Sequence, residues 1–385
     1  MNQWKYVKLG EVCTIERGGS PRPIDDFITT DKNGINWIKI GDADESMYIT
    51  KTAQRIKPEG MKKSRYVKPG DFLLSNSMSF GRPYILKIDG CIHDGWLVLR
   101  DENNVFDKKF LYYYLSAPIT YKRFKSMAVG GVVNNLNSDM VRKVRVPIPS
   151  QEEQHQISDR LDKVSNLIFL RKQQLAKLDE LVKARFVEMF GDPVKNTMDW
   201  EIKPLSELGE LNRGVSKARP RNSPELLGGP YPLIQTGEVA NAKTYITSFN
   251  STYSEKGLAQ SKMWPKGTLC ITIAANIAQT SILTFDACFP DSVVGFISRN
   301  MTNELFIHYW FSFFQKILDE QAPQVAQKNI NLKILSELNV IVPPLSLQNR
   351  FAAFVERVDQ QKQTAQQSLE KLELMKKALM QEYFG

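Results

Sequence analysis

QHQISDRLDKVSNLIFLRKQQLAKLDELVKARFVEMFG (Gln154–Gly191) aligns without a gap with QNRFAAFVERVDQQKQTAQQSLEKLELMKKALMQEYFG (Gln348–Gly385), at an offset of 194 residues. Chance does not place so many identities in one register; they include Val164 with Val358, Leu175 with Leu369, Leu178 with Leu372, and Lys183 with Lys377. WKYVKLGEVCTIERGGS from Trp4 likewise matches WEIKPLSELGELNRGVS from Trp200, whereas the matches in between are poor. The chain is therefore a duplication whose copies diverged between fixed ends, which suggests that they recognise different things.

Each aligned segment predicts one long helix. Prolines precede it, about forty residues rich in Leu, Lys, Gln, Glu and Ala follow without an internal Gly or Pro, and a glycine ends it. Apolar residues recur at a period of about 3.5, which is typical of a coiled coil. We expect a seam of Ile157, Leu161, Val164, Ile168, Leu175, Leu178, Val182, Phe351, Val355, Val358, Leu369, Leu372 and Leu379, interrupted at Arg171, Arg185, Lys362 and Lys376.

The connectivity favours antiparallel pairing of these helices, each roughly 60 Å long. The first helix ends at the second domain, so an antiparallel second helix returns to the first domain and brings Gly385 near Met1. Two helices packed separately on their own domains are the alternative, which would expose most of each apolar stripe. The predicted boundaries are a domain at 1–149, a helix at 150–192, a domain at 193–343 and a helix at 344–385.

Both globular segments mix short strand-like runs with loops and one or two helices, which predicts α+β domains in a pseudo-twofold internal repeat. The predicted strands are Trp37–Ile40, Phe72–Leu74, Tyr84–Ile88, Leu97–Leu99, Leu269–Ile273, Ser281–Phe285 and Val293–Ile297. The predicted helices are Lys108–Ala117 and Glu304–Glu320.

Composition narrows the functional class. A formal net charge of +9 favours a polyanionic partner, because Lys and Arg release counterions when they neutralise phosphates. Four cysteines without CxxC spacing favour a reducing compartment and argue against a zinc ribbon. The first residues have no signal-peptide core, and no run of about twenty apolar residues occurs, so we expect a cytoplasmic protein.

Basic and amide-rich clusters recur at loop-like positions in both copies. Arg, Asn and Gln read base edges, while Lys, Ser and Thr mostly hold phosphates. Any one cluster is more simply a solvated loop, but their repetition favours binding. The predicted DNA contacts of the first half are Arg22, Lys62, Lys63, Ser64, Ser77 and Arg82, and those of the second are Arg219, Arg221, Lys262, Asn276, Gln279, Gln324 and Gln327.

Motifs of catalysis are missing from the sequence. No GxxxxGK[ST] phosphate loop and no GxGxxG after a strand occurs. IVPPLS (Ile341–Ser346) lacks the Asn or Asp and the aromatic residue of an amino-methyltransferase motif, and Pro290-Asp291 is not followed by Glu-x-Lys of a nuclease. Asp42–Glu45 is read as a polar turn rather than a cation site. We therefore predict no catalytic residue and no metal site.

The chain resembles the specificity (S) subunit of type I restriction-modification systems along its whole length. RGGSPRP, INWIKIGD (Ile35–Asp42), PGDFLLSNSMSFGR (69–82) and VPIPSQEEQ (146–154) carry the resemblance in the first copy. RGVSKARPR, YPLIQTGEV (Tyr231–Val239), CFPDSVVGF (288–296) and VPPLSLQ (342–348) carry it in the second. The usual PLxEQ element reads PSQEEQ at 149–154 and PLSLQ at 344–348, so the second copy lacks its acidic residue.

The resemblance implies that each domain is a target-recognition domain reading half of a bipartite, asymmetric site on double-stranded DNA. The helix pair would fix the spacer and dock two methyltransferase (M) subunits, which use S-adenosylmethionine to methylate adenine N6. Restriction (R) subunits would add translocation and cleavage that depend on ATP and Mg²⁺; this chain would bind none of these cofactors. A coiled-coil protein scaffold and a self-contained methyltransferase are alternatives, and steep salt dependence of duplex binding separates the first of them from a DNA reader.

Overall fold

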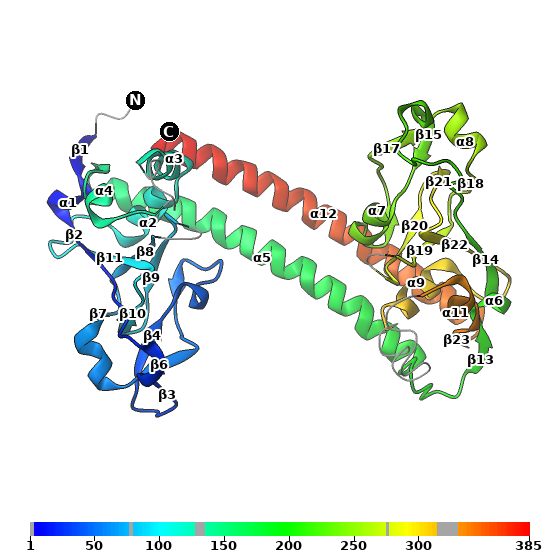
Figure 1. Ribbon diagram of the computed structural model, residues 1–385, viewed down its shortest axis with the longest axis horizontal. Helices are drawn as coiled ribbons and strands as arrows, with labels where there is room; N and C mark the ends of the chain where they lie inside the picture. Colours follow the sequence, from blue (N-terminus) through cyan, green and yellow to red (C-terminus); the bar gives the residue numbers. More distant parts are fainter. Residues whose placement is uncertain (1–3, 77–79, 128–134, 275–276, 314–329) are drawn as a thin grey trace. The chain divides into compact units, whose positions relative to one another are not determined.

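The computed structural model describes residues 4–76, 80–127, 135–274, 277–313 and 330–385 (Figure 1). The chain divides into two compact units, Met1–Lys172 with Gln367–Gly385 and Gln173–Gln366. Each unit holds one globular domain and one stretch of each long helix, α5 (Gln151–Phe190) and α12 (Leu345–Phe384). The mixed α+β domains and the two long helices confirm the predicted fold class.

The described part of unit 1 contains a small antiparallel sheet and two larger sheets. The small sheet pairs β1 (Lys5–Lys8) with β12 (Arg145–Ile148). The central sheet has the order β2 (Thr14–Arg17), β11 (Trp96–Arg100), β8 (Phe72–Ser75), β9 (Pro83–Leu86), β5 (Tyr48–Ile49). The distal sheet has the order β3 (Ile28–Thr29), β6 (Gln54–Ile56), β4 (Ile35–Ile38), β10 (Gly90–Ile92), β7 (Arg65–Val67). In Figure 1 the distal sheet lies at the end of unit 1 away from its helix stretches.

The described residues of unit 1 also form shorter helical elements. They are α1 (Leu9–Val12), α2 (Lys108–Ser116), α3 (Pro118–Met127), α4 (Ser138–Arg142), and the 3-10 turns η1 (Ile24–Asp26), η2 (Ile40–Asp42) and η3 (Pro58–Lys63).

Central strands of unit 1 are apolar on both faces because both faces are covered. Along β11, Leu97 and Leu99 pack with α2 and α5 in one core, while Trp96 and Val98 pack against the distal sheet in another. This alternation follows from the two-residue period of a strand. It explains why these strands read as continuous apolar runs.

Unit 2 repeats this plan. Its small sheet pairs β13 (Glu201–Pro204) with β23 (Asn339–Val342). Its central sheet has the order β14 (Gly209–Arg213), β22 (Val293–Ser298), β19 (Leu269–Thr272), β20 (Thr280–Leu283), β16 (Tyr245–Ile246). Its distal sheet has the order β17 (Ser251–Tyr253), β15 (Leu227–Leu233), β21 (Ala287–Cys288), β18 (Met263–Trp264). The helical elements are α6 (Leu205–Leu208), η4 (Pro224–Leu226), α7 (Thr236–Asn241), α8 (Glu255–Ala259), α9 (Glu304–Phe311) and α11 (Leu332–Glu337).

The two long helices run antiparallel within each unit. In unit 1, Arg160 donates to the Tyr383 hydroxyl at 3.0 Å, and Arg171 farther along α5 donates to Ser368 at 3.2 Å, earlier in α12. In unit 2, Lys362 Nζ lies 2.8 Å from Asp179 Oδ1, and the ring of Phe351, earlier in α12, lies 5.4 Å from that of Phe186, farther along α5. Partners on α12 thus move toward its start as α5 advances, which is the predicted direction.

The thirteen residues of the expected seam are all buried or half-buried. Toward the helix ends, aromatic residues next to the seam pack in the cores of the domains. Phe186 and Phe190 pack with Phe306 of α9, and Phe384 packs on Phe110 and Tyr114 of α2. Each helix stretch is therefore anchored in a domain core.

Four basic side chains interrupt the seam, as the sequence indicates: Lys362, whose partner is Asp179, and the three others that follow. Arg171 donates to Ser368, and the Arg185 guanidinium lies 5.8 Å from the Phe354 ring centroid. Lys376 Nζ lies 5.9 Å from the Tyr113 ring centroid, where burial lowers the pKa of this lysine.

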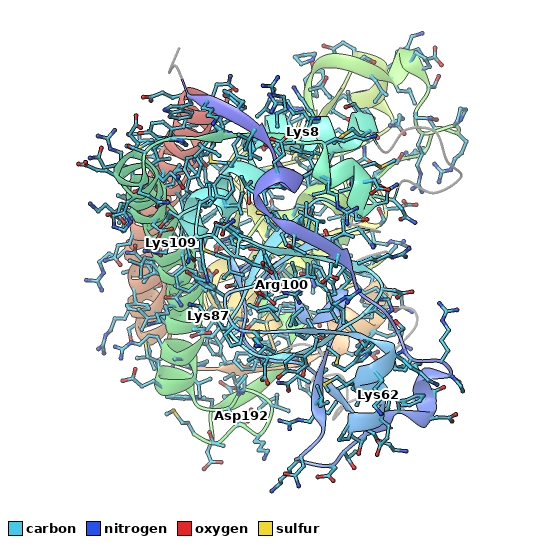
Figure 2. All side chains as sticks on the ribbon, turned by 90° about the vertical axis from the view of Figure 1, so that its left-hand side faces the viewer. Lys8, Lys62, Lys87, Arg100, Lys109 and Asp192 are labelled. Carbon is cyan, nitrogen blue, oxygen red and sulfur yellow. The ribbon has the colours of Figure 1, made fainter. Side chains whose placement is uncertain are left out.

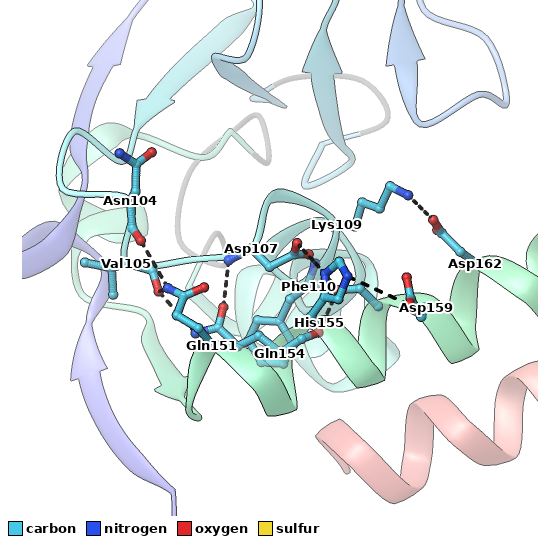
Figure 3. A network of polar contacts seen from close by, with 11 residues as sticks. Asn104, Val105, Asp107, Lys109, Phe110, Gln151, Gln154, His155, Asp159 and Asp162 are labelled. Carbon is cyan, nitrogen blue, oxygen red and sulfur yellow. Dashed lines mark hydrogen bonds and ion pairs between the residues drawn. The ribbon is translucent and has the colours of Figure 1, made fainter.

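The start of α5 is tied to its domain by a buried amide (Figure 3). Gln154 is fully buried; its Oε1 accepts from Asp107 N–H at 2.8 Å, and its Nε2 donates to the carbonyls of Val105 and Pro149, both at 3.1 Å. About two turns later on α5, Asp162 forms an ion pair with Lys109 of α2. This network fixes where the helix leaves the domain.

Several predicted elements differ in extent from the observed ones. The strand expected at Trp37–Ile40 is Ile35–Ile38, because Ile40 already begins the turn η2. The helix expected at Glu304–Glu320 ends at Phe311, with Ser312 as its C-cap; residues 314–320 lie outside the described residues. The sequence also did not predict α3, whose Pro118 occupies the first helical turn, where proline is tolerated.

Candidate nucleic-acid interface

The first arginine cluster consists of Arg17, Arg22 and Asp94, where the chain of unit 1 passes from the central to the distal sheet. Arg17 ends β2, and its Nε donates to the backbone oxygen of Asp94 at 3.0 Å. Arg22 Nη2 lies 3.6 Å from Asp94 Oδ2, with 81% of its side chain exposed. Ser20 Oγ and His93 Nε2 also contact Asp94 Oδ1, at 3.1 and 2.9 Å.

A second arginine cluster, Arg213, Arg219, Arg221 and Asp291, occupies the same place in unit 2. Arg213 ends β14, and its Nε donates to the backbone oxygen of Asp291 at 2.9 Å. Arg221 Nη2 lies 2.6 Å from Asp291 Oδ1, and Arg219 Nη2 lies 3.9 Å from Oδ2. Cis peptide bonds join Arg22 to Pro23 and Arg219 to Pro220. The two copies therefore hold exposed arginines on one aspartate in the same way.

A glycine makes each arginine cluster possible. Gly18 N–H donates to Trp96 O at 2.9 Å, and Gly214 N–H donates to Val293 O at 2.8 Å. A Cβ on Gly18 would lie 2.2 Å from His93 O, and one on Gly214 would lie 2.3 Å from Phe289 O. No larger residue fits this backbone approach, which explains the Arg-Gly match between the copies.

Three predicted contact residues of the first copy lie together on η3 and the residue after it. Lys62 and Lys63 are exposed, and Figure 2 shows Lys62 on the opposite side of unit 1 from Lys8. Lys63 Nζ lies 5.1 Å from the Phe27 ring centroid. Ser64 Oγ donates to Ile92 O at 3.1 Å, so this hydroxyl is used inside the domain.

The loop that contains Lys262 takes the corresponding position in the second copy, before β18. Gln260 Oε1 accepts from Ala218 N–H at 2.9 Å, and Ser261 Oγ donates to Val215 O at 2.7 Å. Lys262 Nζ lies 4.0 Å from the Trp264 ring centroid. These contacts bring the Lys262 loop beside the segment that leads to Arg219.

Arg82 and Gln279 lie elsewhere, at the ends of equivalent hairpins in the central sheets. Arg82 N–H donates to Ser75 Oγ, and Gln279 N–H donates to Thr272 Oγ1, both at 3.0 Å. Both side chains are exposed. The structure therefore separates each predicted contact set into a distal loop group and a hairpin residue. Ser77, Asn276, Gln324 and Gln327 lie outside the described residues.

Four members of these clusters are not among the contacts predicted from the sequence: Arg17, Arg213, Asp94 and Asp291. An aspartate just before a strand carries no pattern by itself. A signal was present, because both precede the strand that pairs with β2 or β14, in HDGW and PDSV. Aligning the copies on those strands would have matched the two aspartates.

Other polar groups fit a structural role. Burial raises the pKa of the Cys13 thiol to about 12 and that of Cys91 to about 11, so both stay protonated at neutral pH. In the Asp42–Glu45 turn, Asp42 accepts backbone N–H groups of Lys39 and Ala53. Among the described residues no group of three or more His, Cys, Asp or Glu side chains is placed to hold a metal ion. None of the described helices is long and apolar enough to cross a membrane.

Comparison with known families adds a decisive observation. The model of the type I restriction modification DNA specificity domain matches residues 1–180 and again residues 197–374. The chain belongs to this family. It is a DNA specificity subunit with two recognition domains, and such a subunit is not itself an enzyme.

Relatives support the assignment over the full length. A candidate type I restriction enzyme MjaX specificity subunit of Methanocaldococcus jannaschii is 24% identical, over 98% of this chain and 94% of the relative. The EcoBI specificity subunit of Escherichia coli is 19% identical, over 93% of this chain and 79% of the relative. The family does not favour the protein-scaffold alternative.

Two solved structures share the fold. The type I restriction-modification S subunit of M. genitalium has a TM-score of 0.61 at 15% identity, covering all of this chain and 96% of that one. A chain from work on complex assembly and conformational transition of the type I R-M system has a TM-score of 0.61 at 17% identity, covering 99% and 97%.

Proposed function

We propose that each unit reads one half of a bipartite, asymmetric DNA site. The observation that carries this proposal is the repetition of one domain plan with different side chains at matching exposed positions, above all Arg82 in one hairpin and Gln279 in the other. A duplicated reader that binds two different half-sites requires a common scaffold with divergent contact residues. Arginine suits guanine and glutamine suits adenine as bidentate partners.

The proposed contacts of the first half-site are Arg22, Lys62, Lys63, Ser64, Ser77 and Arg82, and those of the second are Arg219, Arg221, Lys262, Asn276, Gln279, Gln324 and Gln327. Their residue types supply both phosphate and base-edge partners. The exposure of the cationic members, such as Lys62, Arg22 and Arg221, supports this assignment.

The helix pair is proposed to set the spacer and to dock two M subunits. Exposed apolar side chains on the helices support docking: in unit 1 Leu167, Leu170 and Leu374 are 48%, 56% and 66% exposed. Leu167 and Leu170 are neighbours on the surface of α5, three positions apart, and neighbouring exposed apolar groups are typical of an interaction surface. S-adenosylmethionine would then be bound by M subunits for adenine N6 methylation. ATP and Mg²⁺ would serve R subunits, and this chain would bind none of the three.

Coexpression of the chain with its M partner, followed by mapping of methylated adenines in the host DNA, tests the proposal. A bipartite motif with a fixed spacer is the expected result. Replacing 200–342 by the corresponding domain of a relative should change one half of that motif and leave the other half intact. If both halves change, or if no bipartite motif is methylated, the proposal of two independent readers is wrong.

A further inference from the structure

The two copies share one exposed charged feature, which joins the end of the matched first segment to an aspartate in the diverged part of the domain. In each, an arginine at the end of a central strand donates through Nε to an aspartate backbone oxygen, at 3.0 Å from Arg17 and 2.9 Å from Arg213. In each, the carboxylate of that aspartate also contacts an exposed arginine of the loop after the strand. This arginine is Arg22 in unit 1, and in unit 2 both Arg219 and Arg221 take this role. The contacts of Arg17 and Arg22 with Asp94 thus recur as those of Arg213 and Arg219 with Asp291, and the second copy adds Arg221 on the same carboxylate.

Neighbouring exposed positions were not kept. Arg82 and Gln279 stand at the same point of equivalent hairpins but differ in charge and in the base edge that they can read. The loops before β7 and β18 also differ, because Lys62-Lys63-Ser64 in one corresponds in place to Gln260-Ser261-Lys262 in the other. Side chains that distinguish two half-sites must differ between the copies, whereas a shared feature cannot distinguish them.

We propose that the arginines held by Asp94 and Asp291 bind backbone phosphates and hold each unit on DNA without reading sequence. This inference rests on the proposed function, since it assumes that both units bind duplex DNA. It assigns Arg22, Arg219 and Arg221 to the phosphate backbone rather than to base edges, and it makes Asp94 and Asp291 positioning residues.

The chemistry of the clusters suits a phosphate. The first arginine cluster contains two arginines and one aspartate, and the second contains three arginines and one aspartate. Both clusters therefore have a net positive charge. Arg221 is 42% exposed and presents its contact to Asp291 through Nη2. A guanidinium has five N–H donors, so a carboxylate on one terminal nitrogen leaves others for a phosphate oxygen.

Arg219 differs from Arg221 in how much of its hydrogen bonding is internal. Its Nη1 donates to Ser216 O at 2.7 Å and to Ala218 O at 2.8 Å, which fixes the loop that carries Arg221. Substitution of Arg219 therefore mixes a structural effect with a binding effect. Arg22 and Arg221, which have fewer internal contacts, are the positions at which the proposal is tested.

The experiment compares the complex of the full chain and its M partner with the same complex carrying Arg22→Ala, Arg221→Ala, or Arg22→Lys. Lys333→Ala is the matched control, because Lys333 is 81% exposed and is paired with Glu337 at 4.0 Å on α11. Binding to the cognate duplex and to a scrambled duplex is measured from about 50 to 200 mM salt, a range over which phosphate contacts change affinity strongly.

Each alanine variant should lower the slope of log K against log salt by about 0.9, the value for one phosphate contact. Cognate and scrambled binding should weaken by the same factor, and the methylated motif should be unchanged. Arg22→Lys should keep the slope, because a phosphate accepts a point charge, whereas a bidentate base contact does not survive this change. Lys333→Ala should leave all three readouts at the wild-type value.

A relaxed or altered base in the motif of either alanine variant would overturn the proposal, because the arginine would then read sequence. An unchanged salt slope would also overturn it. A merely structural role predicts a lower melting temperature with the wild-type slope. Failure of the wild-type complex to methylate any bipartite site would instead count against the proposed function, and the slope on scrambled duplex would still test the phosphate contacts.

Discussion

Gln348 repeats in unit 2 the three contacts that Gln154 makes in unit 1, and it also accepts from Thr302 Oγ1 at 2.9 Å. Its Nε2 donates to Pro343 O at 2.8 Å and Met301 O at 3.0 Å, while its Oε1 accepts from Asn303 N–H at 3.3 Å. Both glutamines are fully buried. The last residue of the PSQEEQ and PLSLQ elements thus locks each long helix to the loop that caps a helix of its domain, α2 or α9.

The acidic residue of the element has a different task. Glu153 accepts from the backbone N–H and hydroxyl of Ser150, a capping contact at the start of α5. The second copy has Leu347 at the matching place, and Pro344 directly before α12. The helix start tolerates this loss because the glutamine, not the acid, makes the tie to the domain.

Gln348→Ala should lower the free energy of unfolding by about 2–4 kcal/mol, because it leaves buried N–H and C=O groups without partners and opens a cavity. Urea unfolding of the full chain measures the change. Gln156→Ala is the control, since Gln156 is exposed and its Nε2 donates one hydrogen bond, at 3.3 Å, to Glu152 on the same helix. A loss below about 0.5 kcal/mol for Gln348→Ala would show that the buried amide contributes little.

Gly214→Ala should destabilise unit 2 by about 1–3 kcal/mol, because the added Cβ meets two backbone oxygens that have no rotamer to change. Those atoms are Phe289 O at 2.3 Å and Pro290 O at 2.4 Å. Gly237→Ala in α7 is the matched control: nothing lies within 4 Å of its Cβ, and alanine favours a helix by up to about 1 kcal/mol. Thermal unfolding should therefore move in opposite directions for the two variants, and a shared direction would contradict this account.

His308 makes the stability of unit 2 depend on pH. Burial, together with the positive charge of Lys362, lowers the pKa of this histidine to about 4, while its Nδ1 lies 2.9 Å from Thr280 Oγ1. The unfolded chain, with a histidine pKa near 6.5, binds more protons than the folded chain between these values. The stabilisation is therefore complete above about pH 6.5 and is lost as the pH falls toward 4.

From pH 7 to pH 5 this histidine should cost the chain about 2 kcal/mol of unfolding free energy, at 1.36 kcal/mol per pKa unit. His308→Gln keeps a polar partner for Thr280 and removes the titration. Urea midpoints at both pH values measure the difference between wild type and variant. That difference should narrow at pH 5; if it stays constant, His308 does not titrate as its burial requires.

The sequence predicted the long helices well because their signals are local and dense. Forty residues without Gly or Pro, with apolar groups every three or four positions, specify a helix with a buried stripe whatever surrounds it. The direction of pairing followed from connectivity. The sequence predicts a coiled-coil seam along the helices. In the structure, Phe186, Phe190 and Phe384 also pack in the domain cores, against α9 and α2, and no local pattern on the long helices indicates these contacts.

The candidate site was harder to predict because its members are far apart in the chain. Asp94 meets Arg22 across 72 residues, and nothing local marks an aspartate in a loop as an arginine partner. Lys62 and Arg82 were selected by residue type, and the structure places them in different parts of unit 1, on η3 and at a hairpin of the central sheet. Which of them meets DNA stays a prediction.

Lys362 and Asp359 of α12 form an ion pair that is largely shielded from solvent within the helix pair. Lys362 Nζ lies 2.8 Å from Asp179 Oδ1 and 3.3 Å from Asp359 Oδ1, and the lysine side chain is 12% exposed. Burial disfavours its charge, but the Asp179 contact and nearby anionic groups outweigh burial and raise the pKa of Lys362. Burial raises the pKa of Asp359 as well, despite the lysine beside it.

Lys362→Met should destabilise the chain by about 1–3 kcal/mol, because the half-buried Asp359 carboxylate loses its counter-charge. Asp179→Asn should cost less than about 1 kcal/mol, since 45% of that side chain is exposed and solvent screens it. Adding Asp359→Leu to Lys362→Met should recover at least half of the loss, because an apolar pair can replace a buried ion pair without penalty. A double variant no more stable than Lys362→Met in urea unfolding would mean that packing of the lysine stem, rather than its charge, stabilises this part of the helix pair.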